Sequence, residues 1–434
     1  MNEKFSESDT LKSKVNNYLH YGYLPPEQIP RFLSELPHQD KVPTEVSLTA
    51  TIELFDEVFR EAIEKSKGSG FCIVPLSGGW DSRILLGYAL EHFPAHQIKT
   101  YTFGSQGQLD YEIGKKVART AGVEHTAFDL ERVTLEWDHL KSSTRKTPWT
   151  YPMDSFFNKY CYSEMQSGAD FILSGFMGEP LTGGHTYEVN GTDVKRIFTA
   201  SQQLVKKSPL TLPGYDPVES LPDLPENTIF LDHQLFDLGV RQANCIAPIL
   251  TYKVRWDRWG TDMGFVDGSK TAIITPFIDP RWIGYWLSVP ETFKRKRALY
   301  LDFLNAKFPR LWNIASKDYY GARNDQGPLH FLMKKKYHGK ILLNRKFPHR
   351  FSAPKEMVNY LDYDKAFRKR DDYQEILSRA FSFLEARNLI EGFHPAPLID
   401  QHMNYTRNHS RLFLVLIGLA LNLQIEEEES VSPA

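Results

Sequence analysis

The chain has 434 residues, a formal net charge of −2, and a composition that is 41% hydrophobic and 24% charged. That length leaves room for about two or three domains with at least one large core, and the composition is typical of an ordinary globular protein. A nearly balanced charge leaves no basic footprint, so we expect no nucleic-acid partner. The three cysteines are far apart and form no CxxC pair, which argues against a structural zinc, a disulfide framework or a dithiol redox site.

The amino terminus is polar, and no signal peptide is visible. The longest apolar run, Leu412 to Leu423, is too short to span a bilayer and predicts a buried helix. We therefore expect no membrane partner and a cytoplasmic location.

The first 50 residues are polar and include "YLHYGYLPPEQIP", which is typical of a linker-like connecting segment. From 51 to 184, helical spacing alternates with short apolar runs. The predicted order is helix 50–66, strand 71–76, helix 81–93, strand 98–104, helix 110–122 and strand 170–175. Buried strands interleaved with helices predict an α/β fold with a doubly wound, mostly parallel sheet.

Pro, Gly, Ser and Thr accumulate over 186–227, which indicates a long loop or insertion. From 228 onward the spacing is mostly helical, so we predict a helical C-terminal part. The last stretch, "QIEEEESVSPA" (424–434), is predicted to be a frayed tail.

The stretch "FCIVPLSGGWDS" (71–82) places two glycines directly after a buried strand and before a helix. Glycines allow a tight turn, and a helix N-terminus attracts anions, so phosphate is the natural guest. Asp81 would repel a phosphate unless a cation lies between them, and Mg²⁺ binds both kinds of oxygen. The alternative is that Ser77 or Asp81 caps the helix and the glycines form a simple turn. No Lys follows the glycines, so this is not a Walker loop.

The segment "SGGWDS" matches the SGGxDS signature of the PP-loop ATP pyrophosphatases, which split ATP between the α- and β-phosphates. Other segments resemble the synthetase domain of asparagine synthetases and of β-lactam-synthetase-like relatives, in the same order along the chain. They are "YTFGSQGQLDYEIGKKVARTAGVEHTAF" (101–128), "LSGFMGEPLTGGH" (173–185) and "TPFIDPRWIGYWLSVPETFKRKRALYLDFLNAKFP" (275–309). The resemblance covers roughly residues 15–320. It implies the PP-loop (adenine nucleotide α-hydrolase-like) fold, with ATP and Mg²⁺ as cofactors.

Carried over position by position, the resemblance implies a set of ATP-binding residues. Those of the signature would surround the pyrophosphate: Ser77, Gly78, Gly79, Asp81 and Ser82. Those beside adenosine would be Leu76, Phe103, Ser174 and Gly175. Asp81 and Glu179 would bind magnesium. Phe103 could equally belong to the core, and Ser174 could cap the end of its strand.

The family places a lysine before the helix that begins near residue 298, where it neutralises the adenylation transition state. Arg297 stands at that position, with Lys296 and Lys294 as alternatives. A guanidinium binds phosphate through two parallel hydrogen bonds and stays charged. The alternative is a solvated basic helix start. Arg255 and Arg258 stand where the family has an Arg-containing substrate-side segment.

Several residues depart from the family pattern. Glu179 replaces an Asp, and Pro180 removes a carboxylate and a backbone N–H. Phe176 stands where relatives have a Glu or Tyr, and it can neither donate nor accept a proton. His185 is one candidate for the missing base, although a structural role is the alternative.

Glutamine-dependent relatives begin with a nucleophilic cysteine in a glutaminase domain, whereas this sequence begins Met1-Asn2. We therefore predict that nitrogen comes as ammonia, from solution or a separate glutaminase, or as a substrate amine. The predicted domains are a linker-like segment (1–50), a synthetase domain (51–320) and a helical extension (321–434).

The predicted function is an ATP-dependent, AMP-forming ligase. It adenylates a small-molecule or peptide carboxylate, such as a sugar uronate or an amino-acid-like acid, and transfers the acyl group to nitrogen. The alternatives are another PP-loop chemistry on a nucleotide or RNA base, and a degenerate domain that binds nucleotide without turnover.

Overall fold

The computed structural model describes residues 7–21, 24, 46–64, 71–146, 148–149, 152–165, 169–184, 271–323, 326–358, 360–390 and 392–431. His185, Arg255, Arg258 and the predicted loop at 186–227 lie outside these residues.

A parallel sheet forms the centre of the fold, with the strand order β3-β2-β1-β4-β5. The strands are β1 (Phe71–Pro75), β2 (Ile98–Gly104), β3 (Glu124–Asp129), β4 (Ala169–Leu173) and β5 (Ala272–Ile274). Side chains alternate between the faces: Cys72 and Val74 pack on one side, and Ile73 on the other. Because helices cover both faces, the central strands β1 and β4 are mostly apolar, whereas the edge strand β3 (EHTAFD) carries polar side chains. The predicted doubly wound α/β fold is confirmed.

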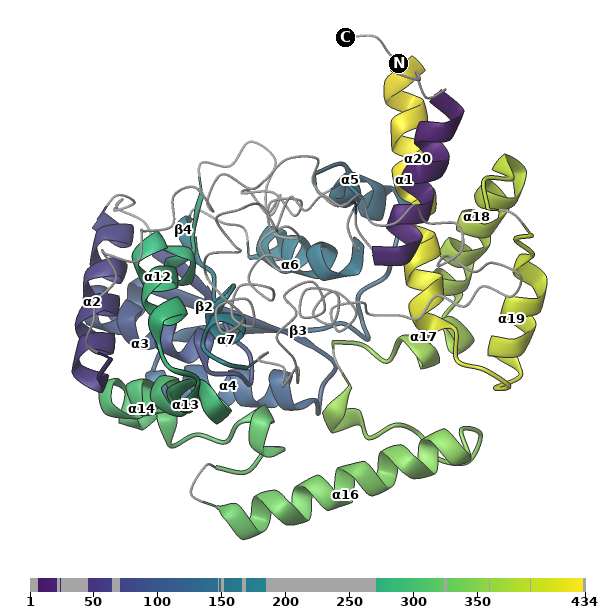
Figure 1. Cartoon of the computed structure of the whole chain (residues 1–434). Coiled ribbons are helices and arrows are strands. Elements are labelled where there is room, and N and C mark those ends of the chain that lie inside the picture. Colours follow the sequence, from purple (N-terminus) through teal and green to yellow (C-terminus); the bar gives the residue numbers. More distant parts are fainter. Residues whose placement is uncertain are drawn as a thin grey trace.

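Helices from distant parts of the sequence cover one face of the sheet and share one core. They are α2 (Leu48–Glu64), α3 (Asp81–His92), α4 (Leu109–Ala121), α12 (Pro280–Ser288) and α14 (Ala298–Lys307). The other face packs against α6 (Pro152–Glu164) through Ile73, Tyr101 and Cys161. In Figure 1, α2, α3, α12 and α14 gather on one side of the strands, with α6 on the other.

A second core holds helices from both ends of the sequence. It includes α1 (Glu7–Tyr21), α5 (Trp137–Lys146), α17 (Tyr363–Lys369), α18 (Asp371–Arg387), α19 (Pro395–Met403) and α20 (Ser410–Val431). The apolar run from Leu412 to Leu423 is a buried part of α20, as predicted. Within the predicted linker-like segment, α1 buries Tyr18 and Leu19 against this core and lies beside α20 (Figure 1). The domain boundaries themselves stay a prediction.

The prediction of a frayed tail is wrong for Gln424–Val431, which continues α20 to its end. Positively charged side chains and hydrogen-bond donors from other elements contact the acidic run. Glu426 accepts hydrogen bonds from Lys14 and from the Trp149 indole, both at 2.9 Å, and Glu428 pairs with Arg145 at 2.6 Å. These partners come from distant segments of the sequence, so the tail sequence alone does not indicate that the acidic side chains are paired.

The remaining elements are short, apart from one long helix, α16 (Gly327–Lys346). The short ones are α7 (Gly178–Leu181), α13 (Glu291–Lys294), α15 (Pro309–Trp312), η3 (Ala95–Gln97), η5 (Pro276–Ile278), η6 (Arg295–Arg297), η7 (Lys317–Tyr319) and η8 (Lys355–Met357). Figure 1 shows α16 along the edge of the molecule, away from the sheet. Within the described part of the chain, every helix is too short or too polar to cross a bilayer.

Candidate functional site

The loops that follow β1 and β4 meet at the carboxyl edge of the sheet. These two strands are neighbours, while β2 lies on the other side of β1, so the strand order reverses here. Open α/β sheets bind ligands in the crevice at such a switch point. The loop after β1 carries the glycines and leads into α3, and the loop after β4 leads into α7. A hydrogen bond of 3.0 Å from the Glu179 N–H to Asp81 Oδ2 joins the two segments.

Hydrogen bonds within the glycine loop define its shape. The Gly79 N–H donates to Ser77 Oγ at 3.2 Å, and the Ser77 N–H donates to Ser82 Oγ at 3.3 Å. The N-cap residue of α3 is Trp80, which makes no side-chain cap hydrogen bond. The alternative in which Ser77 or Asp81 caps α3 therefore does not describe this loop. Ser77 instead stabilises the turn itself, with backbone N–H groups gathered at the helix start.

The carboxylate of Asp81 lies in the first turn of α3 and faces α7 and α14. Its Oδ1 accepts a hydrogen bond of 2.7 Å from the Tyr300 hydroxyl, and its Oδ2 accepts the N–H of Glu179. Burial, followed by the charge of Glu179, raises the pKa of Asp81 to about 7 despite these donors. A Cβ at Gly178 would lie 2.5 Å from Asp81 Cγ, so glycine permits this close approach.

Arg297 bridges Glu179 and Asp318. Its Nη1 lies 3.2 Å from Glu179 Oε1, and its Nη2 lies 2.7 Å from Asp318 Oδ2. Burial alone would lower the pKa of Arg297, but the two carboxylates raise it above its ordinary value. Lys296 and Arg297 both have positive φ, at 54° and 60°. This turn directs Arg297 to the site while Lys296 is exposed. The Lys294 side chain is buried, and its carbonyl packs against Gly183.

Lys317 contacts the glycine loop in the structure. The sequence patterns did not identify this residue as part of the site. The N–H of Lys317 donates to the Gly78 carbonyl at 3.2 Å, and its Nζ lies 3.2 Å from Asp110 Oδ1. The same Asp110 oxygen accepts the Gly78 N–H at 2.8 Å. Burial alone would lower the pKa of Lys317, but Asp110 raises it. The sequence holds only a weak signal for this residue, a single Lys in "NIASKDYY".

Arg83 fixes the segment that carries Lys317. Its side chain is fully buried and donates to the carbonyls of Gly78, Leu311, Ile314 and Ala315. Its guanidinium lies 4.5 Å from the Trp80 ring centroid, and burial lowers its pKa to about 10. One buried cation thus joins the glycine loop to residues 311–315.

The positions matched to adenosine contacts have different surroundings. Leu76 is buried in the core beneath the loop, and a Cβ at Gly175 would lie 3.1 Å from Asp81 Cβ. Phe103 is partly buried and packs against the ring of Tyr360 at 5.1 Å, which suits the core alternative. The Ser174 hydroxyl accepts the Phe176 N–H at 3.3 Å, as a strand-end cap would. The Phe176 side chain itself packs against the helix-covered core.

Magnesium fits the donor chemistry of the site. Mg²⁺ is commonly held by one or two protein carboxylates together with substrate phosphates. Asp81 and Glu179 supply two carboxylates close enough for the charge of one to raise the pKa of the other. Among the described residues, no group of three or more His, Cys, Asp or Glu forms an all-protein metal site.

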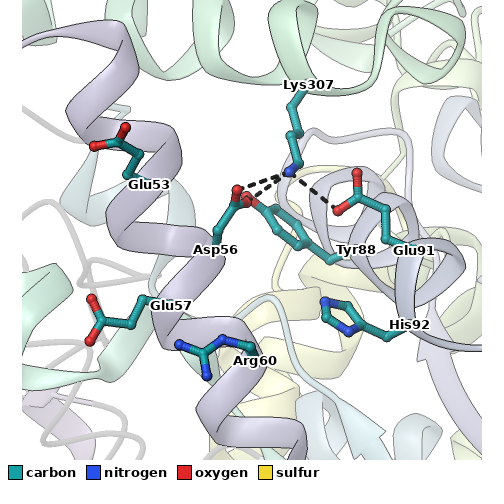
Figure 2. Close-up of a pocket in the computed structure, with 8 residues that line it drawn as sticks. All are labelled: Glu53, Asp56, Glu57, Arg60, Tyr88, Glu91, His92 and Lys307. Carbon is teal, nitrogen blue, oxygen red and sulfur yellow. Dashed lines mark hydrogen bonds and ion pairs between the residues drawn. The ribbon is translucent and has the colours of Figure 1, made fainter.

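A separate pocket of about 450 Å³ lies at the far end of α3 (Figure 2). Its lining comes from α2, the last turns of α3 and Lys307, whose Nζ lies 2.9 Å from Asp56 and 3.3 Å from Glu91. Tyr88 also donates to Asp56. Lys307 and these carboxylates neutralise one another. The glycine loop lies at the opposite end of α3, so this pocket is separate from the candidate site.

Comparison with known proteins finds similarity to a protein family and to curated relatives. The model of the family described as asparagine synthase matches residues 54–212. A 58-residue stretch is 34% identical to the 7-cyano-7-deazaguanine synthase of Staphylococcus aureus (strain bovine RF122 / ET3-1). That stretch is 13% of this chain and 26% of the other protein, so it spans about a quarter of the relative's length. Residues 54–212 are therefore similar to the asparagine synthase family.

Proposed function

We propose that this protein is an AMP-forming ligase that activates a carboxylate with ATP and joins it to ammonia or an amine. The observation that carries the proposal is the meeting of the glycine loop, Asp81, Glu179, Arg297 and Lys317 at the switch point of the sheet. Phosphate-binding amides, two carboxylates and two cations are the groups that adenylation needs. The family match supports the same reaction class.

In the first step, a substrate carboxylate oxygen attacks the α-phosphorus of ATP. A bond forms between that oxygen and phosphorus, the bond to the β-phosphate oxygen breaks, and pyrophosphate leaves. A nitrogen lone pair then attacks the acyl carbon, AMP departs with the electron pair of the carbon–oxygen bond, and the nitrogen loses a proton. Activation is needed because a free carboxylate is a poor acyl donor.

The backbone amides and the charged side chains of the site have distinct roles in this proposal. Backbone N–H groups of Gly78 and Gly79 bind pyrophosphate oxygens, as amides at a helix start commonly do. Lys317 and Arg297 stabilise the charge that grows on the leaving pyrophosphate, which is mainly electrostatic work. Mg²⁺ held by Asp81 and Glu179 would supply further neutralisation of that charge.

Binding of ATP requires an exchange of partners at the loop. The Asp110 carboxylate accepts the Gly78 N–H and pairs with Lys317. A phosphate group would take over both donors, since it carries more charge than the carboxylate. Asp110 therefore orients the loop amide and the lysine toward one another.

The test is carboxylate-dependent exchange of labelled pyrophosphate into ATP, over a library of sugar uronates, amino-acid-like acids and peptides. We expect exchange with a subset of the acids, and AMP rather than ADP as the product once an amine is added. Formation of ADP would refute the proposed reaction. Binding of ATP without exchange for any acid would favour the degenerate alternative, which the pairing of Glu179 with Arg297 also suits.

A further inference from the structure

Large apolar side chains are exposed along α16 and the segment that follows it. Exposed fractions reach 56% for Phe331, 63% for Leu332 and 64% for Leu342. Leu329, Leu343, Phe347 and Phe351 are exposed in the same stretch. Contiguous exposed apolar groups of this kind mark an interaction surface.

The same segment is strongly basic. Residues 327–355 contain eight Lys and Arg and no Asp or Glu. Without these eight positive charges, a chain of net charge −2 would carry −10. This segment therefore carries a local excess of positive charge that the overall net charge conceals.

The outer face of α16 combines both kinds of side chain. Phe331, Lys335, Leu342 and Lys346 repeat at helical spacing, and Leu332, Lys336 and Leu343 form an adjacent row. All seven side chains are exposed. The two apolar pairs, 331–332 and 342–343, are eleven residues apart, which is about 16 Å along the helix axis.

The inner face packs against the candidate site. Tyr337 is buried, and its ring lies 6.3 Å from that of Tyr320, which follows the helical turn η7 that carries Lys317. The ring of His330 lies 5.3 Å from Tyr319 and 5.7 Å from Tyr320. This packing holds α16 in place and leaves its apolar and basic face outward.

We propose that residues 327–355 dock the protein on an anionic phospholipid surface. Leu and Phe side chains would enter the boundary between headgroups and acyl chains, while the lysines lie over lipid phosphates. The sequence expectation of no membrane partner rests on the lack of a signal peptide and of a long apolar run, and neither feature detects a local surface of this kind. The inference does not depend on the ligase reaction.

Charge and composition favour this partner over others. Three of the four apolar side chains on the outer face, Leu332, Leu342 and Leu343, have no π-face on which a nucleic-acid base could stack. Lysine is depleted in protein–protein interfaces, which weighs against an acidic protein. A second copy of the chain would bring two basic faces together, and like charges repel. An anionic bilayer matches both the apolar and the cationic side chains.

The experiment is co-sedimentation of the full chain with vesicles of phosphatidylglycerol and phosphatidylcholine, compared with vesicles of phosphatidylcholine alone. We expect binding to the anionic vesicles that weakens as salt is raised. The combined K335Q, K336Q and K346Q variant should bind about 100-fold more weakly, since each lysine near an anionic surface contributes about fivefold. The L332S, L343S variant should lose at least about tenfold, because its apolar contacts with the bilayer are removed.

Matched controls change exposed residues elsewhere. The K116Q, K365Q, K369Q variant alters charge by the same amount, and M403S removes an exposed apolar side chain on α19. Both should bind vesicles as the unmodified protein does. Circular dichroism and the denaturation midpoint should be unchanged in every variant, since each substituted side chain is exposed.

No binding to anionic vesicles would overturn the proposal, as would equal binding to neutral ones. The fluorescence anisotropy of a labelled single-stranded oligonucleotide tests whether the same surface binds nucleic acid. Tight oligonucleotide binding, together with vesicle binding that the L332S, L343S variant retains, would identify a general polyanion site and overturn the lipid assignment.

Discussion

Lys317 and Gly78 are in direct contact across the candidate site. The lysine N–H donates to the glycine carbonyl at 3.2 Å, and a Cβ on Gly78 would lie 3.2 Å from Lys317 Cβ. The contact fixes a cation beside the loop amides. Such prior placement of charge is the usual basis of electrostatic catalysis.

Lys317→Gln should reduce pyrophosphate exchange by about 10²-fold or more, because it removes charge stabilisation at the leaving group. Lys317→Arg should restore part of the rate, since it keeps the charge. The matched control is Lys296→Gln. Lys296 is exposed, and the family resemblance makes it an alternative catalytic candidate. Equal losses in the Lys317 and Lys296 variants would contradict the assignment of Lys317.

Asp81→Asn should lower turnover by about 10²-fold or more, because it removes one of the two carboxylates proposed to hold Mg²⁺. The fold should remain, since an amide can still pair with Tyr300. The measurement is exchange rate against magnesium concentration, with denaturation as the control for folding. Unchanged magnesium dependence would restrict Asp81 to a structural role.

Arg83→Met should reduce the free energy of unfolding by about 3–5 kcal/mol, because it leaves buried carbonyl groups without their donor. Denaturant unfolding measures the loss. Arg310→Met is the matched control, since Arg310 is exposed and makes a single bond of 3.4 Å to the Thr120 carbonyl. A change below about 1 kcal/mol in both variants would show that Arg83 does not anchor the loop.

His402 makes stability depend on pH. Its ring is fully buried, and burial, with a contribution from Arg368, lowers its pKa from 6.5 to about 4. The unfolded chain therefore binds a proton below pH 6.5 that the folded protein does not bind. The contribution of His402 to stability is fully present above pH 6.5 and is lost as pH drops toward 4, by up to about 1.4 kcal/mol per pH unit.

We expect His402→Gln to flatten this slope between pH 6.5 and 4, measured by denaturant unfolding at several pH values. His96→Gln, at an exposed position, should leave the slope unchanged. Equal slopes in the His402 variant and the unmodified protein would assign the pH dependence to other groups.

Much of the central fold could be predicted from the sequence. The strand at 98–104 has the predicted bounds, and the strand at 71–75 and the helix at 81–92 end within one residue of theirs. The central strand at 71–75 is buried on both faces and is mostly apolar, so it is visible in the sequence as a continuous apolar run. The tail was mispredicted because its acidic side chains are satisfied by partners from α1, α5 and neighbouring segments.

The sequence by itself determined the parallel sheet and the position of Asp81 directly after the glycine loop, because both are local patterns. It also named Glu179 and Arg297, through family resemblance. Only the tertiary structure brought Lys317 and Asp110 to the glycines and separated exposed Lys296 from partly buried Arg297. Ion pairs and buried hydrogen bonds depend on distance in space rather than along the chain, so they follow only once the sheet and its helices are assembled.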